Sequence, residues 1–239
     1  MLNKLTNYPM SETTPNQEQI KKFTFSSNFA VGRGLPDNLD ILIPEQLQAS
    51  YSFYTWPSSP ILAWFLWENR IELPNKHILE LGAGTALPSI VAAKCGAHVT
   101  ITESSLLPKS IQHIKHSCQL NGLSNNHVRV LGITWGLFLS NLFKLGTIDL
   151  IIASDCFYDP NVFEDIIVTV SFLLDRNAQA KFLTVYQERS SDWSIEYLLN
   201  KWNLKCEPID LSSLGSQSGI NVQDLMQDHT LHLLKITRK

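Results

Sequence analysis

The stretch HILELGAGTALPS, residues 77–89, decides the fold. Its first five residues are typical of a short buried strand, and residues 87–95 are typical of the helix that follows. Between them, Gly82 and Gly84 lack Cβ atoms, so a ligand can approach the backbone closely. A dinucleotide-binding turn would carry a third glycine where Leu87 stands, which argues against a pyrophosphate ligand. The alternative is a plain strand-to-helix turn that holds nothing.

The alternation of strand and helix continues toward the C-terminus. Short apolar segments between helical ones predict an α/β fold with a parallel sheet covered on both faces. Two strands with no helix between them close the chain and predict a hairpin, so the last strand should run antiparallel. The expected strands are 77–81, 98–102, 127–131, 149–154, 181–187, 205–211 and 229–237, and the expected helices are 87–95, 106–120, 160–174 and 191–202, with an irregular stretch at 134–146.

The N-terminal part of the chain predicts an extension of this fold. Residues 23–27 and 39–45 read as two short strands around a turn at 32–38. Residues 60–70 predict a helix that is apolar on most sides and therefore buried, with Ser58 or Ser59 as its N-cap. We expect a flexible N-terminus at residues 1–21 and a single domain over residues 22–239, because no linker divides the chain.

Composition excludes several classes of protein. Among the 239 residues 44% are hydrophobic, 17% are charged, and the net charge of −3 comes without a long basic run, so direct binding to nucleic acid is not expected. No apolar run approaches the ~20 residues that span a membrane, and the first residues lack the apolar core of a secretory signal. The four cysteines form no CxxC pair, which argues against a metal site and for an intracellular, reducing location.

Three carboxylates follow predicted strands. Glu80 lies at the end of the first strand of the alternating region, Glu103 follows the second, and Asp155 follows the fourth. Ligands of open parallel sheets bind beyond the carboxyl ends of the strands, so we expect these three groups to share one site. An acid after the second strand can accept hydrogen bonds from both hydroxyls of a ribose, which favours an adenosine-containing ligand.

The remaining candidates surround these acids. A carboxylate beside a buried strand is costly unless paired or set in a cleft, so we expect Asp155 to hold or deprotonate a cationic group, with Tyr158 beside it. Trp56 and Trp135, in irregular segments, can wall an adenine or a sulfonium, although tryptophan is most often a core residue. Arg189 follows the fifth strand and faces the substrate side. The same is expected of Asp192 and Trp193, whereas His113, His116 and Cys118 are read as ordinary packing or surface residues.

Five blocks of the sequence together resemble a known family. In order they are YTWPSSPILAWFLW, ILELGAGTALPSIVAAKCGAHVTITE, LGITWG, DLIIASDCFYDP and TVYQERSSDWSIEYLLNKW. They are similar to the seven-β-strand S-adenosylmethionine-dependent methyltransferases, and among these to the family-16 protein methyltransferases. The resemblance runs from about residue 22 to the C-terminus and implies a Rossmann-like seven-stranded sheet with an antiparallel last strand, preceded by a β-hairpin and helix.

The resemblance also implies roles for individual residues. Asp155 and Tyr158 match the family's D-x-x-Y motif, which faces the target side chain, and are the expected catalytic residues. The expected cofactor-binding residues are Trp56, Glu80, Gly82, Ala83, Gly84, Glu103, Trp135 and Ser154. Where the family commonly reads GTGLPGI, this chain reads GTALPSI, so that Ala86 and Ser89 replace two glycines.

The function that follows is methyl transfer from S-adenosylmethionine, with S-adenosylhomocysteine as product. We expect an arginine methyltransferase acting on histone H3 or another basic protein, in the nucleus and cytoplasm, with chaperone or chromatin-associated partners and no contact with nucleic acid or membrane. The alternatives are a lysine methyltransferase with a non-histone target and an adaptor that binds the cofactor without activity. A nicotinamide oxidoreductase is disfavoured, because a Tyr-x-x-x-Lys pair is missing.

Overall fold

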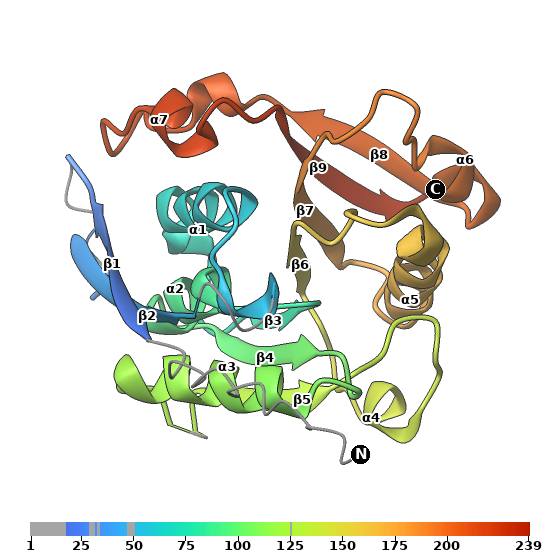
Figure 1. The fold of residues 1–239 in the computed structure, drawn as a ribbon, viewed down its shortest axis with the longest axis horizontal. Coiled ribbons are helices and arrows are strands. Elements are labelled where there is room, and N and C mark those ends of the chain that lie inside the picture. Colours follow the sequence, from blue (N-terminus) through green and yellow to red (C-terminus); the bar gives the residue numbers. More distant parts are fainter. Residues whose placement is uncertain (1–17, 29–31, 33, 47–50, 125) are drawn as a thin grey trace, which may run out of the picture.

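The structure is a computed structural model that describes residues 18–28, 32, 34–46, 51–124 and 126–239. Its centre is a seven-stranded sheet in the order β5-β4-β3-β6-β7-β9-β8 (Figure 1). In sequence order these strands are β3 (His77–Glu80), β4 (His98–Glu103), β5 (Val128–Gly132), β6 (Leu150–Ser154), β7 (Lys181–Gln187), β8 (Leu204–Ile209) and β9 (Leu231–Arg238).

The strand directions confirm the predicted topology. Strands β5, β4, β3, β6 and β7 are parallel to their neighbours, whereas β9 pairs antiparallel with both β7 and β8. The connection between β8 and β9 differs from the prediction, because it contains η4 (Leu211–Ser213) and α7 (Val222–Met226). The loop composition concealed the short helix, whose N-cap Asn221 accepts a hydrogen bond from the Gln223 amide.

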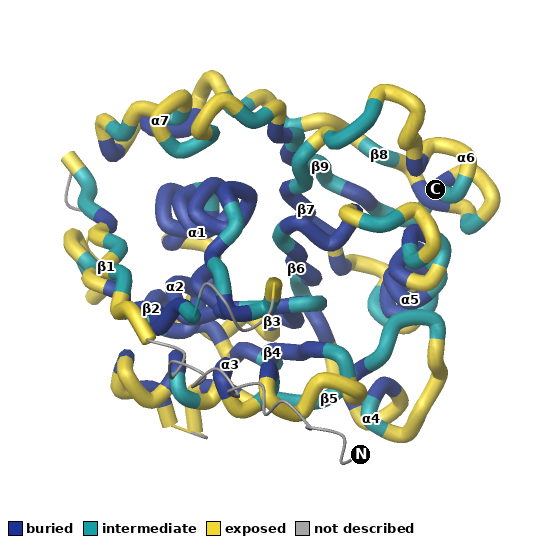
Figure 2. Tube along the Cα trace, viewed as in Figure 1, coloured by how far each residue is buried: buried dark blue, intermediate teal, exposed yellow. Residues whose placement is uncertain are grey.

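Helices cover the sheet on both faces, as the alternating pattern predicted. One face carries α1 (Ser58–Glu68), α2 (Leu87–Lys94) and α3 (Pro108–Leu120), and the other carries α4 (Ser140–Phe143), α5 (Phe163–Arg176) and α6 (Glu196–Lys201). The buried residues form one hydrophobic cluster on each face, and Figure 2 shows α1, α2 and the central strands as the most buried elements. None of the described helices combines the length and hydropathy needed to cross a membrane.

The first helix is buried as predicted but begins differently. Ten of its eleven residues are buried, which matches its uniformly apolar sequence. Its N-cap is Pro57, without a side-chain hydrogen bond, so the prediction that Ser58 or Ser59 caps the helix is wrong. Both serines lie within the first turn, where their hydroxyls are buried and make no hydrogen bond among the described residues. Burial of the whole turn, and not a polar cap, sets the start of this helix.

The N-terminal hairpin forms a separate two-stranded sheet. Strand β1 (Gln19–Ser26) pairs antiparallel with β2 (Asn38–Glu45), as predicted, and begins within the segment 1–21 for which we expected flexibility. The rest of that segment, residues 1–17, lies outside the described residues. Asn121, at the end of α3, holds β2 by accepting a hydrogen bond from the Leu42 amide at 2.9 Å and donating one to the Leu42 carbonyl at 2.7 Å.

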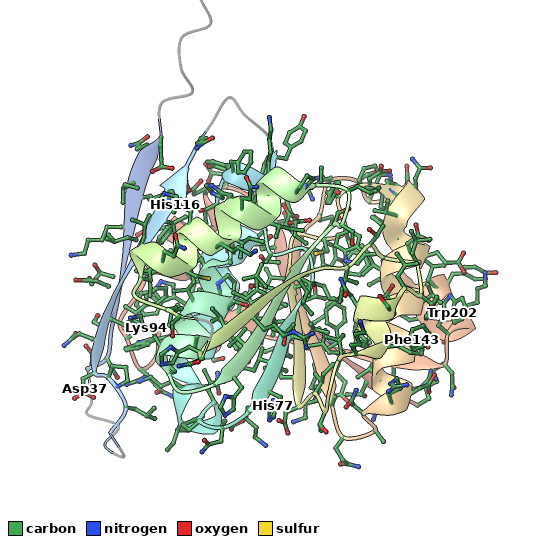
Figure 3. All side chains as sticks on the ribbon, turned by 90° about the horizontal axis from the view of Figure 1, so that it is seen from below. Asp37, His77, Lys94, His116, Phe143 and Trp202 are labelled. Carbon is green, nitrogen blue, oxygen red and sulfur yellow. The ribbon has the colours of Figure 1, made fainter. Side chains whose placement is uncertain are left out.

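The sheet topology also fixes where a ligand can bind. The chain runs from β3 outward through β4 and β5, then returns to the other side of β3 as β6, so the strand order reverses between β3 and β6. Such a reversal leaves a crevice at the carboxyl ends of the strands. His77 marks the amino end of β3 and lies at the lower edge of the sheet in Figure 3, so the crevice lies at the edge opposite to it.

Candidate functional site

A cavity of about 650 Å³ occupies the crevice at the carboxyl ends of the strands. It brings together nine of the ten predicted site residues, from segments far apart in the sequence: Trp56, Gly82, Ala83, Gly84, Glu103, Trp135, Ser154, Asp155 and Tyr158. Its size suits a ligand of nucleoside dimensions, since small-molecule sites commonly measure about 300–1,000 Å³. Glu80 is the predicted residue that does not line the cavity.

The turn after β3 forms one wall of the cavity and depends on its two glycines. Gly82 has a φ of +60°, and a Cβ there would lie 2.6 Å from Cζ2 of Trp135. Gly84 has a φ of +53°, and its Cβ would lie 3.5 Å from the Ser52 carbonyl oxygen. The first glycine is therefore required both by its backbone angle and by the indole packed on it, the second by its backbone angle alone.

Ala86 explains the departure from the family's glycine pattern. It is fully buried in the core beneath the turn, is not among the residues that line the cavity, and has a φ of +64° as the residue that precedes α2. A left-handed conformation costs a residue with a Cβ about 1–2 kcal/mol, which is why glycine suits the position. The substitution consequently affects the strain in the turn and not the space available to a ligand.

Glu103 lies where a ribose-binding acid is expected. One carboxylate oxygen accepts a hydrogen bond from the Gly84 amide at 3.1 Å and the other from the Ser104 amide at 2.8 Å. Burial raises the pKa of Glu103, and the two amides oppose that rise. Each carboxylate oxygen offers about two acceptor positions, so one remains on each for a ligand hydroxyl. The Gly84 contact also ties this acid to the glycine turn.

Glu80 takes a different position from the one predicted. It is fully buried, and neither carboxylate oxygen makes a hydrogen bond of normal geometry within the described part of the chain. Burial raises its pKa to about 8 and outweighs the opposing influence of the Ser89 hydroxyl and amide. The expectation that Glu80 touches the ligand is therefore corrected, because the side chain at the end of β3 points into the protein beneath the turn.

Asp155 forms the opposite wall, and its carboxylate is already paired. Arg189 donates from Nη1 to Oδ1 at 2.9 Å and from Nη2 to Oδ2 at 2.7 Å, a two-pronged contact of the kind that arginine makes with carboxylates. Asp155 itself is buried and has a φ of +57°. A strained residue in a cleft is typical of functional sites. The sequence placed both residues on the substrate side but did not predict their pairing.

Tyr158 and Cys156 follow Asp155 into the cavity wall. Tyr158 is half exposed, and partial burial is the first cause of the rise in its pKa, so its hydroxyl remains a neutral donor. The Cys156 thiol is buried, donates to the Leu81 carbonyl at 3.2 Å, and has a pKa raised by burial well above its usual value. The thiol is therefore a packed floor of the cavity and not a nucleophile.

Several lining residues were not predicted from the sequence. The additional ones are Tyr51, Ser52, Tyr54, Ser59, Thr85, Leu107, Cys156, Asp159, Gln187, Arg189 and His229, of which only Arg189 had been assigned to this side of the sheet. Asp192 and Trp193 do not line the cavity, and Trp193 packs on Phe163 instead. The signal available for Asp159 and Gln187 was their place after strand ends, whereas His229 reaches the site through β9.

The packing residues and the hairpin also have clear places. His113 is buried with its ring 4.6 Å from that of Phe53, and His116 pairs with Glu18, as expected for residues outside the site. Among the described residues, no hairpin side chain lines the cavity, and no group of histidine, cysteine and acidic side chains could hold a metal ion. The expectation that the hairpin excludes water from the site is therefore corrected.

These residues fit S-adenosylmethionine. The turn at Gly82–Gly84 leaves its backbone open on the cavity side, and Glu103 keeps free acceptor positions for ribose hydroxyls. Trp56 and Trp135 line the same space and provide aromatic faces for an adenine or a sulfonium cation. Nothing in this arrangement prepares a pyrophosphate site, in agreement with Leu87 at the position of the third glycine.

Comparison with known proteins identifies the family. A family model described as "Lysine methyltransferase" matches residues 35–200. The chain is 43% identical to Histone-arginine methyltransferase METTL23 of Xenopus laevis, over 82% of this chain and 84% of that protein, and 44% identical to the protein of the same name from Homo sapiens, over 77% and 96%. Its fold is similar to that of an S-adenosylmethionine-dependent methyltransferase from Agrobacterium tumefaciens, with a TM-score of 0.57, 17% identity, and 83% and 67% of the two chains covered. The resemblance inferred from the five sequence blocks is thereby confirmed, and the chain belongs to the lysine methyltransferase family as an S-adenosylmethionine-dependent protein methyltransferase.

Proposed function

We propose that this methyltransferase modifies an arginine side chain of a histone H3 tail or a similarly basic protein. The observation that carries the proposal is the pairing of two carboxylates across one cavity. Glu103 suits the ribose of the cofactor, and the buried Asp155, on the other wall, already holds a guanidinium group. Two relatives bear the name histone-arginine methyltransferase, which supports the same substrate.

The charge of the cavity favours a cationic acceptor. Glu103, Asp155 and Asp159 line it, and Arg189 is the permanently charged cation among its described lining residues. The ion pair neutralises Asp155, so Glu103 and Asp159 remain as the other acidic groups. A basic side chain entering from solvent meets a favourable potential on this surface, and a negatively charged one is repelled.

The chemistry requires alignment more than acid–base power. S-adenosylmethionine, when bound, supplies a methyl group activated by the sulfonium. Asp155 accepts hydrogen bonds from the acceptor nitrogen group and thereby orients it, while Trp56 and Tyr158 restrict the approach of water. Correct alignment of two reacting groups is worth several kcal/mol, about 7–11 in favourable intramolecular cases. The acceptor proton leaves toward the Asp155 carboxylate or the solvent at the half-exposed Tyr158.

The proposal is tested by labelled methyl transfer to separated histones and to whole-cell extract, followed by mass-spectrometric mapping of the modified residue. We expect methylarginine in H3. Asp155→Asn should lower turnover at least tenfold and leave cofactor affinity within about twofold, because asparagine tolerates a positive φ but carries no charge. Normal turnover of that variant would make Asp155 merely structural.

The family description favours a second candidate, a lysine methyltransferase with a non-histone target. The same assay separates the two, because residue mapping would then find methyllysine in proteins of the extract and none in histones. If S-adenosylmethionine binds in calorimetry while no protein accepts label, the adaptor interpretation gains instead.

We further propose that the protein acts in the nucleus and cytoplasm, with chaperone or chromatin-associated partners and without direct contact with nucleic acid or membrane. A histone substrate supports this location, since histones are made in one compartment and used in the other. Fluorescence imaging of the tagged protein tests the location, and affinity purification with nuclease treatment tests the partners. Exclusion of the protein from the nucleus would contradict the location and argue against histone as the substrate.

A further inference from the structure

Arg189 occupies the place in the cavity that the proposed function assigns to the substrate. Its two terminal nitrogens contact both oxygens of Asp155, and the side chain of Asp155 is 6% exposed whereas that of Arg189 is 23% exposed. The acid is thus fixed in the wall, and the arginine reaches it from the solvent side.

The other attachments of Arg189 are weak. Its guanidinium makes one further printed contact, from Nη1 to the carbonyl of Gln187 at 3.4 Å. Residues 188–194 form no helix or strand between β7 and α6. Within the described part of the chain, the pair with Asp155 is therefore the principal interaction that keeps this side chain in the cavity.

The buried acid cannot simply lose its partner. Removing one member of a buried ion pair leaves an uncompensated charge, which is strongly unfavourable. A neutral acceptor group therefore cannot take the place of Arg189, but a second cation can. A guanidinium restores both parallel hydrogen bonds, whereas an ammonium group is a compact charge that cannot match the planar, two-pronged geometry.

We propose that Arg189 is an internal occupant of the acceptor position and a specificity-determining residue: its guanidinium leaves Asp155 in exchange for that of the substrate arginine. The inference rests on the proposed function and deepens it, because exchange favours an arginine over a lysine substrate. Before substrate arrives, Arg189 keeps Asp155 paired. Once substrate is bound, the same two oxygens orient the nitrogen that receives the methyl group.

The first test measures binding and does not depend on turnover. The full chain, loaded with S-adenosylhomocysteine, is titrated with N-methylguanidinium chloride and with methylammonium chloride in a calorimeter. Arg189→Ala should bind N-methylguanidinium at least tenfold more tightly than the unmodified chain, with a clearly smaller gain for methylammonium. Adding Asp155→Asn to Arg189→Ala should remove the gain. Arg176→Ala, which removes an exposed arginine outside the cavity, should behave like the unmodified chain.

The second test distinguishes exchange from permanent support of Asp155. With the protein substrate, exchange predicts that N-methylguanidinium inhibits Arg189→Ala competitively and that the KM of this variant for the substrate falls severalfold. Restoration of lost activity by N-methylguanidinium would overturn the proposal, because Arg189 would then be a fixed positioning residue. Arg189→Lys, which keeps the charge without the fork, should give an intermediate KM and guards against misfolding of the alanine variant.

The outcomes separate the two proposals. No gain in guanidinium binding by either variant overturns the exchange, whatever protein is methylated. A gain that requires Asp155, together with methyllysine as the mapped product, would contradict the arginine substrate and the specificity assigned to Arg189. A gain that requires Asp155, with no label on histones, supports the exchange and contradicts only the histone as target.

Discussion

Glu103 and Glu80 are both buried glutamates at strand ends, but their surroundings give them different roles. Glu103 accepts two backbone hydrogen bonds and faces the cavity, whereas Glu80 is enclosed beneath the glycine turn. The difference follows from the direction in which each side chain leaves its strand. Two residues of the same type thus separate into a ligand-binding acid and an internal one, and each leads to its own prediction.

Glu103→Ala should weaken binding of S-adenosylmethionine at least tenfold, because two ribose hydroxyls lose their acceptor and the Gly84 amide loses its partner. Glu103→Asp should retain most of the affinity, since the family more often has aspartate at this position. Isothermal calorimetry measures both. Glu207→Ala, which removes an exposed acid on β8, is the control. Unchanged affinity of Glu103→Ala would refute the assignment to the ribose.

Glu80 should make stability depend on pH. Its pKa rises from 4.5 to about 8 on folding, so the folded protein keeps a proton that the unfolded chain releases in this window. The stabilisation is complete below pH 4.5 and is lost as pH rises toward 8, by at most about 1.4 kcal/mol per pH unit.

The variant Glu80→Gln cannot titrate there, so its advantage over the unmodified chain should grow between pH 5 and 8. Urea unfolding of both ligand-free proteins measures the difference. Burial lowers the pKa of His113, which acts with the opposite sign in both proteins and cancels in the comparison. A constant difference across this range would show that Glu80 is ionised in the folded protein.

The turn between β3 and α2 is the element on which the site depends. Ala83 donates its amide hydrogen to the Thr102 carbonyl, so the turn is tied to the end of β4 as well as to Glu103. The left-handed conformations at Gly82, Gly84 and Ala86 fold the backbone back on itself within five residues. The sequence revealed the turn through its glycines, but the conformation of Ala86 was hidden, because alanine carries no signal for a positive φ.

Gly82→Ala tests this turn. The new Cβ would meet the Trp135 ring at 2.6 Å in addition to the cost of the backbone angle, so we expect destabilisation of roughly 2–4 kcal/mol and loss of cofactor binding. Gly34→Ala is the matched control, because its φ is +71° and nothing lies within 4 Å of the new atom. Thermal unfolding of both variants isolates the contact with the indole. Equal destabilisation would mean that Trp135 yields freely.

In the molecule as a whole, the cavity and the N-terminal hairpin are separate parts. The hairpin packs on the α2 and α3 side, away from β8 and β9 (Figure 1), and β2 is anchored through Asn121. The cavity instead draws its walls from η1 (Tyr51–Phe53), from the strand ends and from the segments that follow β6 and β7. Stability of the hairpin and affinity for the cofactor should therefore respond to different mutations.

Asn121→Ala should loosen the hairpin without changing the site. Two buried backbone groups of Leu42 lose their partner, at a cost of about 1–3 kcal/mol. Hydrogen exchange should accelerate in β1 and β2, while cofactor affinity stays within twofold in calorimetry. Thr24→Ala, which removes an exposed contact with Asp40, should change exchange little. A parallel loss of affinity would show that the hairpin supports the cavity after all.

The amino-acid sequence by itself determined the α/β class, the order of the elements and nine of the residues that line the cavity. It could do so because strand and helix periodicities are local, and because the carboxyl ends of parallel strands must meet at one edge. It failed where contacts are long-range or burial is decisive. Glu80 turned inward, Ser58 and Ser59 were drawn into a buried first turn, and the hairpin packed away from the cavity.

Only the tertiary structure decided that Asp155 and Arg189 form a pair. The two residues are 34 positions apart, and the parallel pairing of β6 with β7 places the segments that follow these strands side by side. No local pattern encodes such a contact, because its geometry depends on strand register and on the positive φ of Asp155. The sequence thus determined that an acid lies at this edge of the sheet, and the fold determined which cation it holds.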